Sequence, residues 1–163
     1  MSRSSWADMD CSVAQTLNVI GEWWTLLILR NAFHGMRTFD DFQAQLGIST
    51  SVLSARLKKL TDEGVLSRSP SAHDGRSFEY RLTAKGLELY PVMISLMQWG
   101  DKWCPNGRGR RLDLREKDTG ARIHGARVLS REGKPLDAWD VDVRAGPGAD
   151  QTTQELLKRR RRG

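Results

Sequence analysis

The sequence predicts a mainly α-helical fold with a small amount of β structure. Apolar residues recur every three or four positions through most of residues 12–63, which is the spacing of amphipathic helices. Two short extended runs follow, one on each side of Asp74–Gly75, a dipeptide typical of hairpin turns. The helical spacing then resumes over residues 83–99. Together these patterns favour a helical domain that carries one β-hairpin.

Four helices are expected before the hairpin. They cover residues 12–20, 22–33, 38–46 and 50–63. Thr38 and Ser49 are suited to cap the third and fourth helices, because their hydroxyl oxygens can accept the free N–H groups of the first turn. Gly47 and Gly64 are suited to end the same two helices. The second helix is so apolar that we expect burial on nearly all sides.

A short glycine-containing turn joins the third and fourth helices, which is a helix-turn-helix pattern. With the hairpin directly behind, the order of elements is that of a winged helix. In the fourth helix a buried stripe is expected at Leu53, Leu57 and Leu60. At about 100° per residue, the opposite face carries Ser51, Ala55, Lys58 and Asp62, with Thr50 and Ser54 near its leading edge and Arg56 and Lys59 on its flanks.

Such a face suits a helix that enters the major groove of DNA. Small residues allow close approach, hydroxyls reach base edges and phosphates, and the positive end of the helix dipole points toward the DNA. The hairpin adds Arg68, His73 and Arg76 where a contact with the minor groove or the backbone is expected. The alternative is an ordinary solvated helix face, but the order of elements in a basic chain favours DNA binding.

The rest of the chain divides into three parts. A helix over 83–99 should carry an apolar stripe and a kink at Pro91. From Cys104 the composition shifts, and alternating residues with glycine turns predict three or four short strands. We therefore expect a domain over 1–104, a small β-rich appendage over 105–149 and a basic tail over 150–163 that is either a frayed helix or disordered.

The charge and the absence of certain motifs narrow the function. The formal net charge is +6 and the pI about 9.7, which favours an anionic partner. No apolar run approaches the ~20 residues of a membrane span, and no signal peptide is apparent, so we expect a cytoplasmic protein without a membrane partner. No phosphate loop, nucleophile elbow or metal-binding motif is present in the sequence, so we expect no enzymatic activity, no cofactor and no metal site.

Two long runs resemble the HxlR-type winged-helix transcriptional regulators of bacteria. They are "CSVAQTLNVIGEWWTLLILRNAFHGMRTFDDFQAQLGISTSVLSARLKKLTDEGVLSRS" and "YRLTAKGLELYPVMISLMQWGDKW". The resemblance covers about residues 11–103. It implies a homodimer joined by the first and last helices of the domain, and a recognition helix over 50–62. It further implies DNA contacts by Thr50, Ser51, Ser54, Arg56 and Lys58, with phosphates held by Arg37 and Arg76.

The resemblance also bears on metal and redox chemistry. Some relatives resemble zinc ribbons in their tails, but here the knuckle positions read "EKDTG" and "SREGK" without cysteine, so the appendage is expected to be a degenerate ribbon that binds no metal. Some relatives resemble redox sensors that use a cysteine at the position of Cys11. Cys11 is therefore either a redox sensor or a small residue at a dimer contact. The six tryptophans form either core and dimer interface or an aromatic pocket for an unknown small-molecule effector.

We thus expect a sequence-specific regulator that binds double-stranded DNA as a homodimer at a pseudo-palindrome. Repression by occupation of a promoter is the simpler mode of action. Two alternatives remain open. Winged helices also serve as protein-interaction modules, and the basic tail over 158–162 allows nonspecific DNA binding.

Overall fold

The computed structural model describes residues 9–72 and 77–160. The chain forms two compact units. The central unit is Glu22–Arg127, and the terminal unit combines Met1–Gly21 with Val128–Gly163. The division expected from the sequence, with boundaries after residues 104 and 149, stays a prediction. Each unit is described on its own below.

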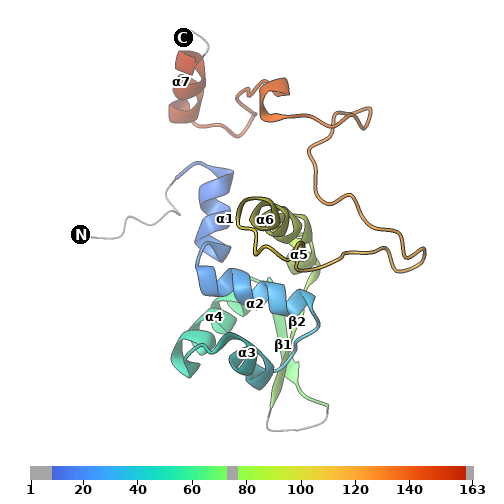
Figure 1. Cartoon of the computed structure of the whole chain (residues 1–163). Coiled ribbons are helices and arrows are strands. Elements are labelled where there is room, and N and C mark those ends of the chain that lie inside the picture. Colours follow the sequence, from blue (N-terminus) through green and yellow to red (C-terminus); the bar gives the residue numbers. More distant parts are fainter. Residues whose placement is uncertain (1–8, 73–76, 161–163) are drawn as a thin grey trace. The chain divides into compact units, whose positions relative to one another are not determined.

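The central unit is a winged helix-turn-helix (Figure 1). Its helices are α2 (Trp23–Phe33), α3 (Phe39–Leu46), α4 (Thr50–Asp62), α5 (Ala84–Leu87) and α6 (Tyr90–Trp103), and its strands are β1 (Leu66–Pro70) and β2 (Phe78–Leu82). The two strands pair antiparallel with Leu66 opposite Leu82. The predicted mainly helical fold with one hairpin is therefore confirmed for this unit.

The core of this unit lies between α2, α3, α4 and the start of β1. Phe42 on α3 and the predicted stripe of α4 are fully buried, with Leu53, Leu57 and Leu60 at 1% exposure or less. The same spacing directs the other face of α4 to solvent. The prediction that α2 is buried on nearly all sides is confirmed: apart from the exposed Trp23, every residue of the helix is buried or half-buried.

The ends of α3 follow the predicted capping residues. The Thr38 hydroxyl accepts a hydrogen bond from the Asp41 N–H (3.2 Å), and the Asp41 carboxylate accepts one from the Thr38 N–H (3.1 Å). This reciprocal pair satisfies two N–H groups that the helix itself leaves free. The hydrogen bonds from Thr38 hold the pKa of the Asp41 carboxyl below its usual value. Gly47 ends α3 with φ +60°, a conformation that glycine adopts without strain.

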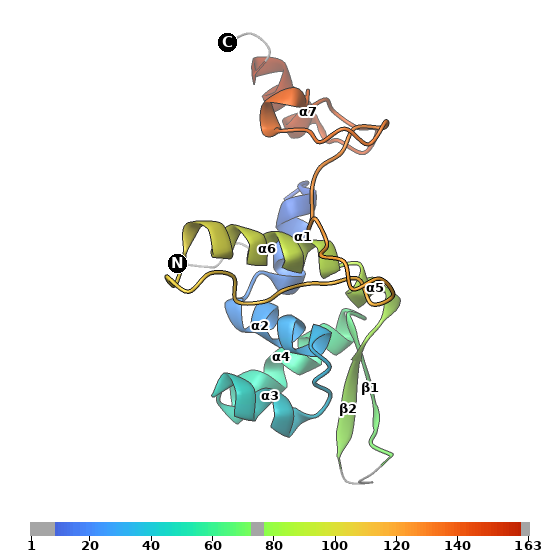
Figure 2. The same cartoon turned by 45° about the vertical axis from the view of Figure 1, so that its right-hand side comes forward.

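The wing is fastened to the helices on both sides. Along β2, the Tyr80 N–H donates to the Arg37 carbonyl (2.7 Å), so the residues before α3 extend the hairpin. At the end of α4, the Thr83 hydroxyl donates to the Gly64 carbonyl and the Lys85 ammonium to the Glu63 carbonyl, each at 2.7 Å. The position of the wing is therefore tied to both ends of the helix-turn-helix (Figure 2).

The single kinked helix expected over residues 83–99 is wrong. The structure has a short α5 and a separate α6, with Pro91 in the first turn of α6. Proline is favourable there because the first N–H groups of a helix have no partner within the helix. Gly86 allows α5 to lie close to β1, since a Cβ at this position would come within 2.3 Å of the Val65 carbonyl oxygen.

The three or four strands predicted for the appendage are also wrong. Residues 105–149, all of which are described, contain no strand: their only β pairing is two isolated bridges, Arg115 with Arg122 and Leu129 with Pro135. Each bridge closes a turn in which a glycine has positive φ, Gly120 in one and Gly133 in the other. Most apolar side chains of this stretch are exposed. An isolated pair of strands without a covered apolar face is unstable in water, which explains why no ladder extends from either bridge.

The terminal unit contains α1 (Ser12–Ile20), the 3₁₀ turn η2 (Ala138–Asp140) and α7 (Gln151–Arg160). The Asp10 carboxylate accepts a hydrogen bond from the Asp150 N–H (2.7 Å), which joins the start of α7 to the residues before α1. The expected apolar face of α1 is only partly buried: Ile20 is buried, whereas Val13 and Leu17 are exposed. Of the two alternatives expected for residues 150–163, a frayed helix or disorder, the structure has the helix, α7, and residues 161–163 lie outside the described part.

No helix within residues 9–72 and 77–160 combines the length and the apolar character needed to cross a membrane.

Candidate nucleic-acid interface

The exposed face of α4 carries most of the predicted contact residues. Thr50, Ser51, Ser54 and Lys58 are all exposed, as the helical periodicity predicts. The first two turns of this face bear only small side chains, because Ala55 is exposed beside Ser51 and Ser54. A second helix or a DNA groove can therefore approach the α4 backbone closely.

The N-terminus of α4 points its free N–H groups toward solvent beside this face. Ser49 caps the helix, and its hydroxyl accepts a hydrogen bond from the Val52 N–H (3.4 Å) and lies 3.3 Å from the Ser51 hydroxyl. The other N–H groups of the first turn have no acceptor within the helix. Together with the helix dipole, they attract a phosphate group.

A groove of about 790 Å³ runs between α4, the start of α3 and the wing. It brings together three residues that the sequence predicts as contacts, Ser54, Lys58 and Arg68. The other residues that line it are Thr38, Phe39, Asp40, Thr61, Asp62, Ser77, Phe78 and Tyr80. The groove therefore joins the exposed face of α4 to the wing in one surface.

Lys58 is paired with Asp62 one turn later on α4, at 2.6 Å. Both side chains are exposed, and an exposed pair at this spacing contributes only about 0.3–0.5 kcal/mol. The pair is therefore easily exchanged for a contact between Lys58 and a phosphate. Asp40 and Asp62 place negative charge on the same groove, so a polyanion is attracted to Lys58 and Arg68 and repelled from these two positions.

Arg68 on β1 is held by an aromatic ring. Its guanidinium carbon lies 3.4 Å from the centre of the Phe78 ring, which is within the range of a cation–π interaction. The contact fixes the stem of an exposed arginine on the wing and leaves guanidinium N–H groups available for a phosphate. Phe78 was not among the predicted residues. The hairpin register, which pairs Arg68 with Tyr80 and Pro70 with Phe78, is the signal that would have found it.

Arg56 differs from the other predicted contacts. Its guanidinium forms an ion pair with Glu22 at the start of α2 (3.4 Å), and only 26% of its side chain is exposed. Its Nε is buried and has no hydrogen-bond partner among the described residues. Arg56 therefore links α4 to α2, and a DNA contact would require this pair to open.

The remaining predicted residues are distributed as follows. Arg37 is half-buried, and its backbone is bound to the wing through Tyr80. His73 and Arg76 lie outside the described residues, so their predicted contacts stay predictions. Cys11 belongs to the terminal unit, where it is exposed and precedes α1 without capping it through its side chain.

Metal ligands do not gather anywhere in the described ranges: no three His, Cys, Asp or Glu side chains are close enough together to hold an ion. The expectation that the degenerate ribbon binds no metal stays a prediction, and zinc analysis of the pure protein tests it.

Comparison with known proteins identifies relatives of this chain. A family model described as HxlR-like helix-turn-helix matches residues 19–108. The uncharacterized HTH-type transcriptional regulator Rv3095 of Mycobacterium tuberculosis is 39% identical over 137 residues, covering 84% of this chain and 87% of that protein. The HTH-type regulator sll1512 of Synechocystis sp. is 33% identical over 94 residues, 57% of this chain and 70% of that protein.

Two solved structures are also similar. The crystal structure of PA1607 has a TM-score of 0.80 and 36% identity, and the match covers 88% of this chain and all of that one. The redox regulator HypR in its oxidized form has a TM-score of 0.52 and 29% identity, covering 56% of this chain and 96% of its own. The likeness to PA1607 thus extends over more of the chain than the likeness to HypR.

Proposed function

Because the chain belongs to the HxlR-like family of helix-turn-helix transcriptional regulators, we propose that it binds a specific DNA sequence through α4 in the major groove. The chain is a regulator of transcription and not an enzyme. The observation that carries the proposal is the exposed face of α4, which is small and hydroxylated at its start, basic further on, and continuous with the wing through one groove.

The residues of this surface divide by the chemistry they offer. Thr50, Ser51 and Ser54 carry short hydroxyl side chains near the N-terminus of α4, the end that enters the major groove first. These hydroxyls can donate and accept hydrogen bonds, so they read base edges. Lys58 is a flexible point charge further along the helix and binds a phosphate. Phosphates are also held by Arg37 and by the wing residues Arg68, His73 and Arg76. Arg56 contributes only if its pair with Glu22 opens on binding.

We further propose that the protein acts as a homodimer joined through α1 and α6. Both helices expose apolar side chains: Val13 and Leu17 on α1, and Leu96, Trp99 and Trp103 on α6. Trp99 alone is 63% exposed, and apolar patches of this kind mark interfaces. A two-fold dimer reads a pseudo-palindrome whose half-sites lie about one helical turn, or a multiple, apart.

Repression follows most simply from this arrangement. A dimer that covers a promoter excludes other proteins without needing a further contact. Because regulation of transcription takes place where the genome is, we place the protein in the cytoplasm of a bacterial cell. Cys11 remains a candidate redox sensor, supported by its exposed thiol and by the similarity to a structure described as a redox regulator.

The experiment that tests the proposal is selection of fragmented host genomic DNA on the purified protein, followed by sequencing. One or a few enriched fragments that share an inverted repeat would support a specific regulator. Uniform recovery would instead indicate nonspecific binding through basic side chains, and recovery of nothing would favour a protein partner for the exposed face of α4. Affinity for an enriched fragment should fall steeply with added salt, because bound phosphates release counterions.

Substitutions in α4 separate the two kinds of contact. Lys58→Ala should weaken binding to all sequences and reduce the slope of affinity against salt by about one. Ser54→Ala should change which base is preferred at one position of the operator, with little effect on the salt slope. Lys117→Ala, an exposed lysine outside the helix-turn-helix, serves as the matched control. Equal losses on all sequences from both α4 variants would contradict this division of roles.

A further inference from the structure

The segment after α6 returns along that helix and is fixed to it at two points. Figure 2 shows the chain that follows α6 running back beside that helix. Near the end of the helix, the Arg111 guanidinium binds the Asp101 carboxylate at 3.0 Å. Nearly a full turn earlier, the Gln98 side-chain oxygen accepts a hydrogen bond from the Ala126 N–H at 3.0 Å. The backbone between these two points is thereby held against the helix.

The second attachment depends on a glycine. Gly125 has φ +81°, and a Cβ at this position would overlap the Gln98 side chain, within 2 Å of its amide nitrogen. A larger residue at this position would therefore have to displace the Gln98 side chain and would adopt a strained backbone conformation. The close approach is a specific feature of the segment and not a loose contact.

A hollow of about 520 Å³ lies between α6 and the segment. Its apolar lining comes from both sides, namely from Ile94, Met97, Leu112, Leu114 and Ile123. This volume falls within the range of roughly 300–1,000 Å³ that is usual for small-molecule sites. The hollow is thus large enough for a ring system or a short aliphatic chain.

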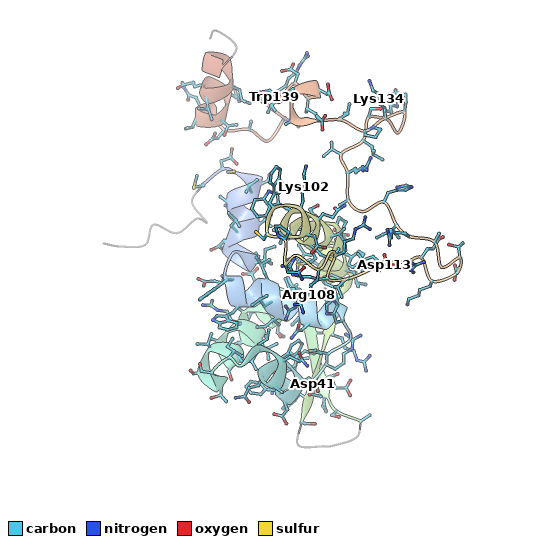
Figure 3. The ribbon with its side chains drawn as sticks, viewed as in Figure 1. Asp41, Lys102, Arg108, Asp113, Lys134 and Trp139 are labelled. Atoms are coloured by element: carbon cyan, nitrogen blue, oxygen red, sulfur yellow. The ribbon has the colours of Figure 1, made fainter. Side chains whose placement is uncertain are left out.

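The polar lining of the hollow is strongly basic. Its charged residues are Lys102, Arg110, Arg122 and Arg127 against one acid, Asp101, and Gln98 and His124 add further polar groups. Asp101 is bound to Arg111, and Arg122 is bound to Asp113 (2.7 Å). Among the described residues, Arg110 and Arg127 have no carboxylate or carbonyl partner, and Lys102 rests over the ring of Trp103. Figure 3 shows Lys102 on α6 and Asp113 on the segment.

We propose that this hollow binds a small organic carboxylate with an apolar body. The carboxylate pairs with Arg110 and Arg127, since a guanidinium matches the two carboxylate oxygens with two parallel N–H donors. The apolar body lies on Leu112, Leu114 and Ile123. Because α6 forms one wall, a bound ligand shifts the geometry of the helix that we assign to the dimer, and so alters the affinity for DNA. This last step rests on the proposed function, whereas binding of the ligand does not.

Calorimetry on the full chain tests the site, with 2-naphthoate as the probe and its neutral isostere 2-naphthamide as the control ligand. We expect 2-naphthoate to bind at least about tenfold more tightly than 2-naphthamide. Inorganic phosphate should bind at least about tenfold more weakly than 2-naphthoate, because it has no apolar body. Equal binding of the acid and the amide would overturn the proposal, and so would equal binding of phosphate and 2-naphthoate.

Three variants locate the binding. The double variant Arg110→Gln/Arg127→Gln should lose about tenfold or more in affinity for 2-naphthoate. Arg108→Gln, a matched change on the same segment outside the hollow, should lose nothing (Figure 3). Arg127→Lys keeps the charge, and should retain most of the affinity even if the double variant fails to fold. A loss in Arg108→Gln as large as that in the double variant would show that general charge, and not this site, binds the ligand.

The coupling to DNA is measured separately, as the affinity for a selected operator with and without saturating 2-naphthoate. A shift of about fivefold or more supports the coupling. Ligand binding without any shift would leave the site established and overturn its regulatory role. A protein that binds 2-naphthoate but no DNA would contradict the proposed function and support the site alone.

Discussion

The helix-turn-helix, residues 38–64, and the stretch over 105–149 both alternate apolar residues with polar ones and glycines, yet only the first forms regular structure. In the helix-turn-helix the apolar side chains, such as Phe42 and Leu57, are buried against neighbouring helices. In the other stretch Leu129 and Val143 are exposed. An apolar pattern therefore forms a helix or a strand where another element packs against it, and a series of turns where no element does.

The same contrast holds for the capping of helices. Thr38 and Asp41 form a reciprocal pair at the start of α3, an eight-residue helix that packs on the core. Asp137 and Asp140 form an equivalent pair at the start of η2, which ends after three residues with none of them buried. An identical local device thus gives two outcomes, because a cap starts a helix while packing determines how far the helix continues.

The largest effect should come from removing a buried side chain. Leu57→Ala should lower the free energy of unfolding by about 3 kcal/mol, because the cavity left in the core adds to the lost burial. Leu129→Ala, the same change at a side chain that is 53% exposed, should cost less than about 0.5 kcal/mol. Urea unfolding at one protein concentration measures both. Similar losses from the two variants would show that residues 105–149 contribute to a core after all.

A close backbone contact in the central unit should give the next largest effect. Gly86→Ala should destabilise by about 2 kcal/mol, because its Cβ would come within 2.3 Å of the Val65 carbonyl oxygen. Gly100→Ala on α6 is the matched control, since no atom lies within 4 Å of the added Cβ. That change should stabilise the protein by about 0.5–1 kcal/mol, because alanine is the better helix former. The thermal midpoints of the two variants should therefore move in opposite directions.

A smaller effect is expected at the cap of α3. Thr38→Ala should cost about 1 kcal/mol at neutral pH. The lowered pKa of Asp41 means that its contribution is present above the unfolded value, about 4, and is lost as pH falls through the folded value. In Asp41→Asn the stability should therefore depend less on pH below about 4 than in the unchanged protein.

The equivalent cap of η2 provides the control for this pH dependence. Asp140→Asn removes the matching carboxylate from a turn with no buried residue. We expect the unfolding midpoint of this variant to equal that of the unchanged protein at each pH from 2 to 6. A shift as large as that of Asp41→Asn would mean that η2 is part of a cooperatively folding unit, and the contrast between the two caps would then be lost.

Much of the helix-turn-helix could be predicted because local signals and packing agree there. Thr38, Gly47 and Ser49 start and end helices at the predicted positions, and Leu53, Leu57 and Leu60 give the buried face of α4. The break between α5 and α6 was missed because the apolar spacing and Pro91 were interpreted as one kinked helix, whereas Pro91 lies in the first turn of a separate helix. The strands of the appendage were mispredicted because alternation of apolar and polar residues does not itself provide an element that packs on the apolar side chains.

The candidate site was predictable as a face but not as a set of pairings. The periodicity places Ser51, Ser54 and Lys58 on the exposed side of α4. It cannot show that Arg56 turns toward Glu22, because that pair joins two helices that are separated by a third. It also cannot show that Phe78 supports Arg68, because the contact depends on the pairing of β1 with β2.

The hydrogen bonds from Thr83 and Lys85 to the end of α4 have a consequence for how such regulators diverge. The α4 helix, the wing and α5 are joined at one junction, so α4 cannot be tilted relative to the wing without breaking bonds to the Gly64 and Glu63 carbonyls. A duplicated copy that acquires a new target therefore changes its preference through side chains at positions such as 51, 54 and 55. The angle between α4 and the wing is then inherited, while the side chains on the exposed face of α4 change.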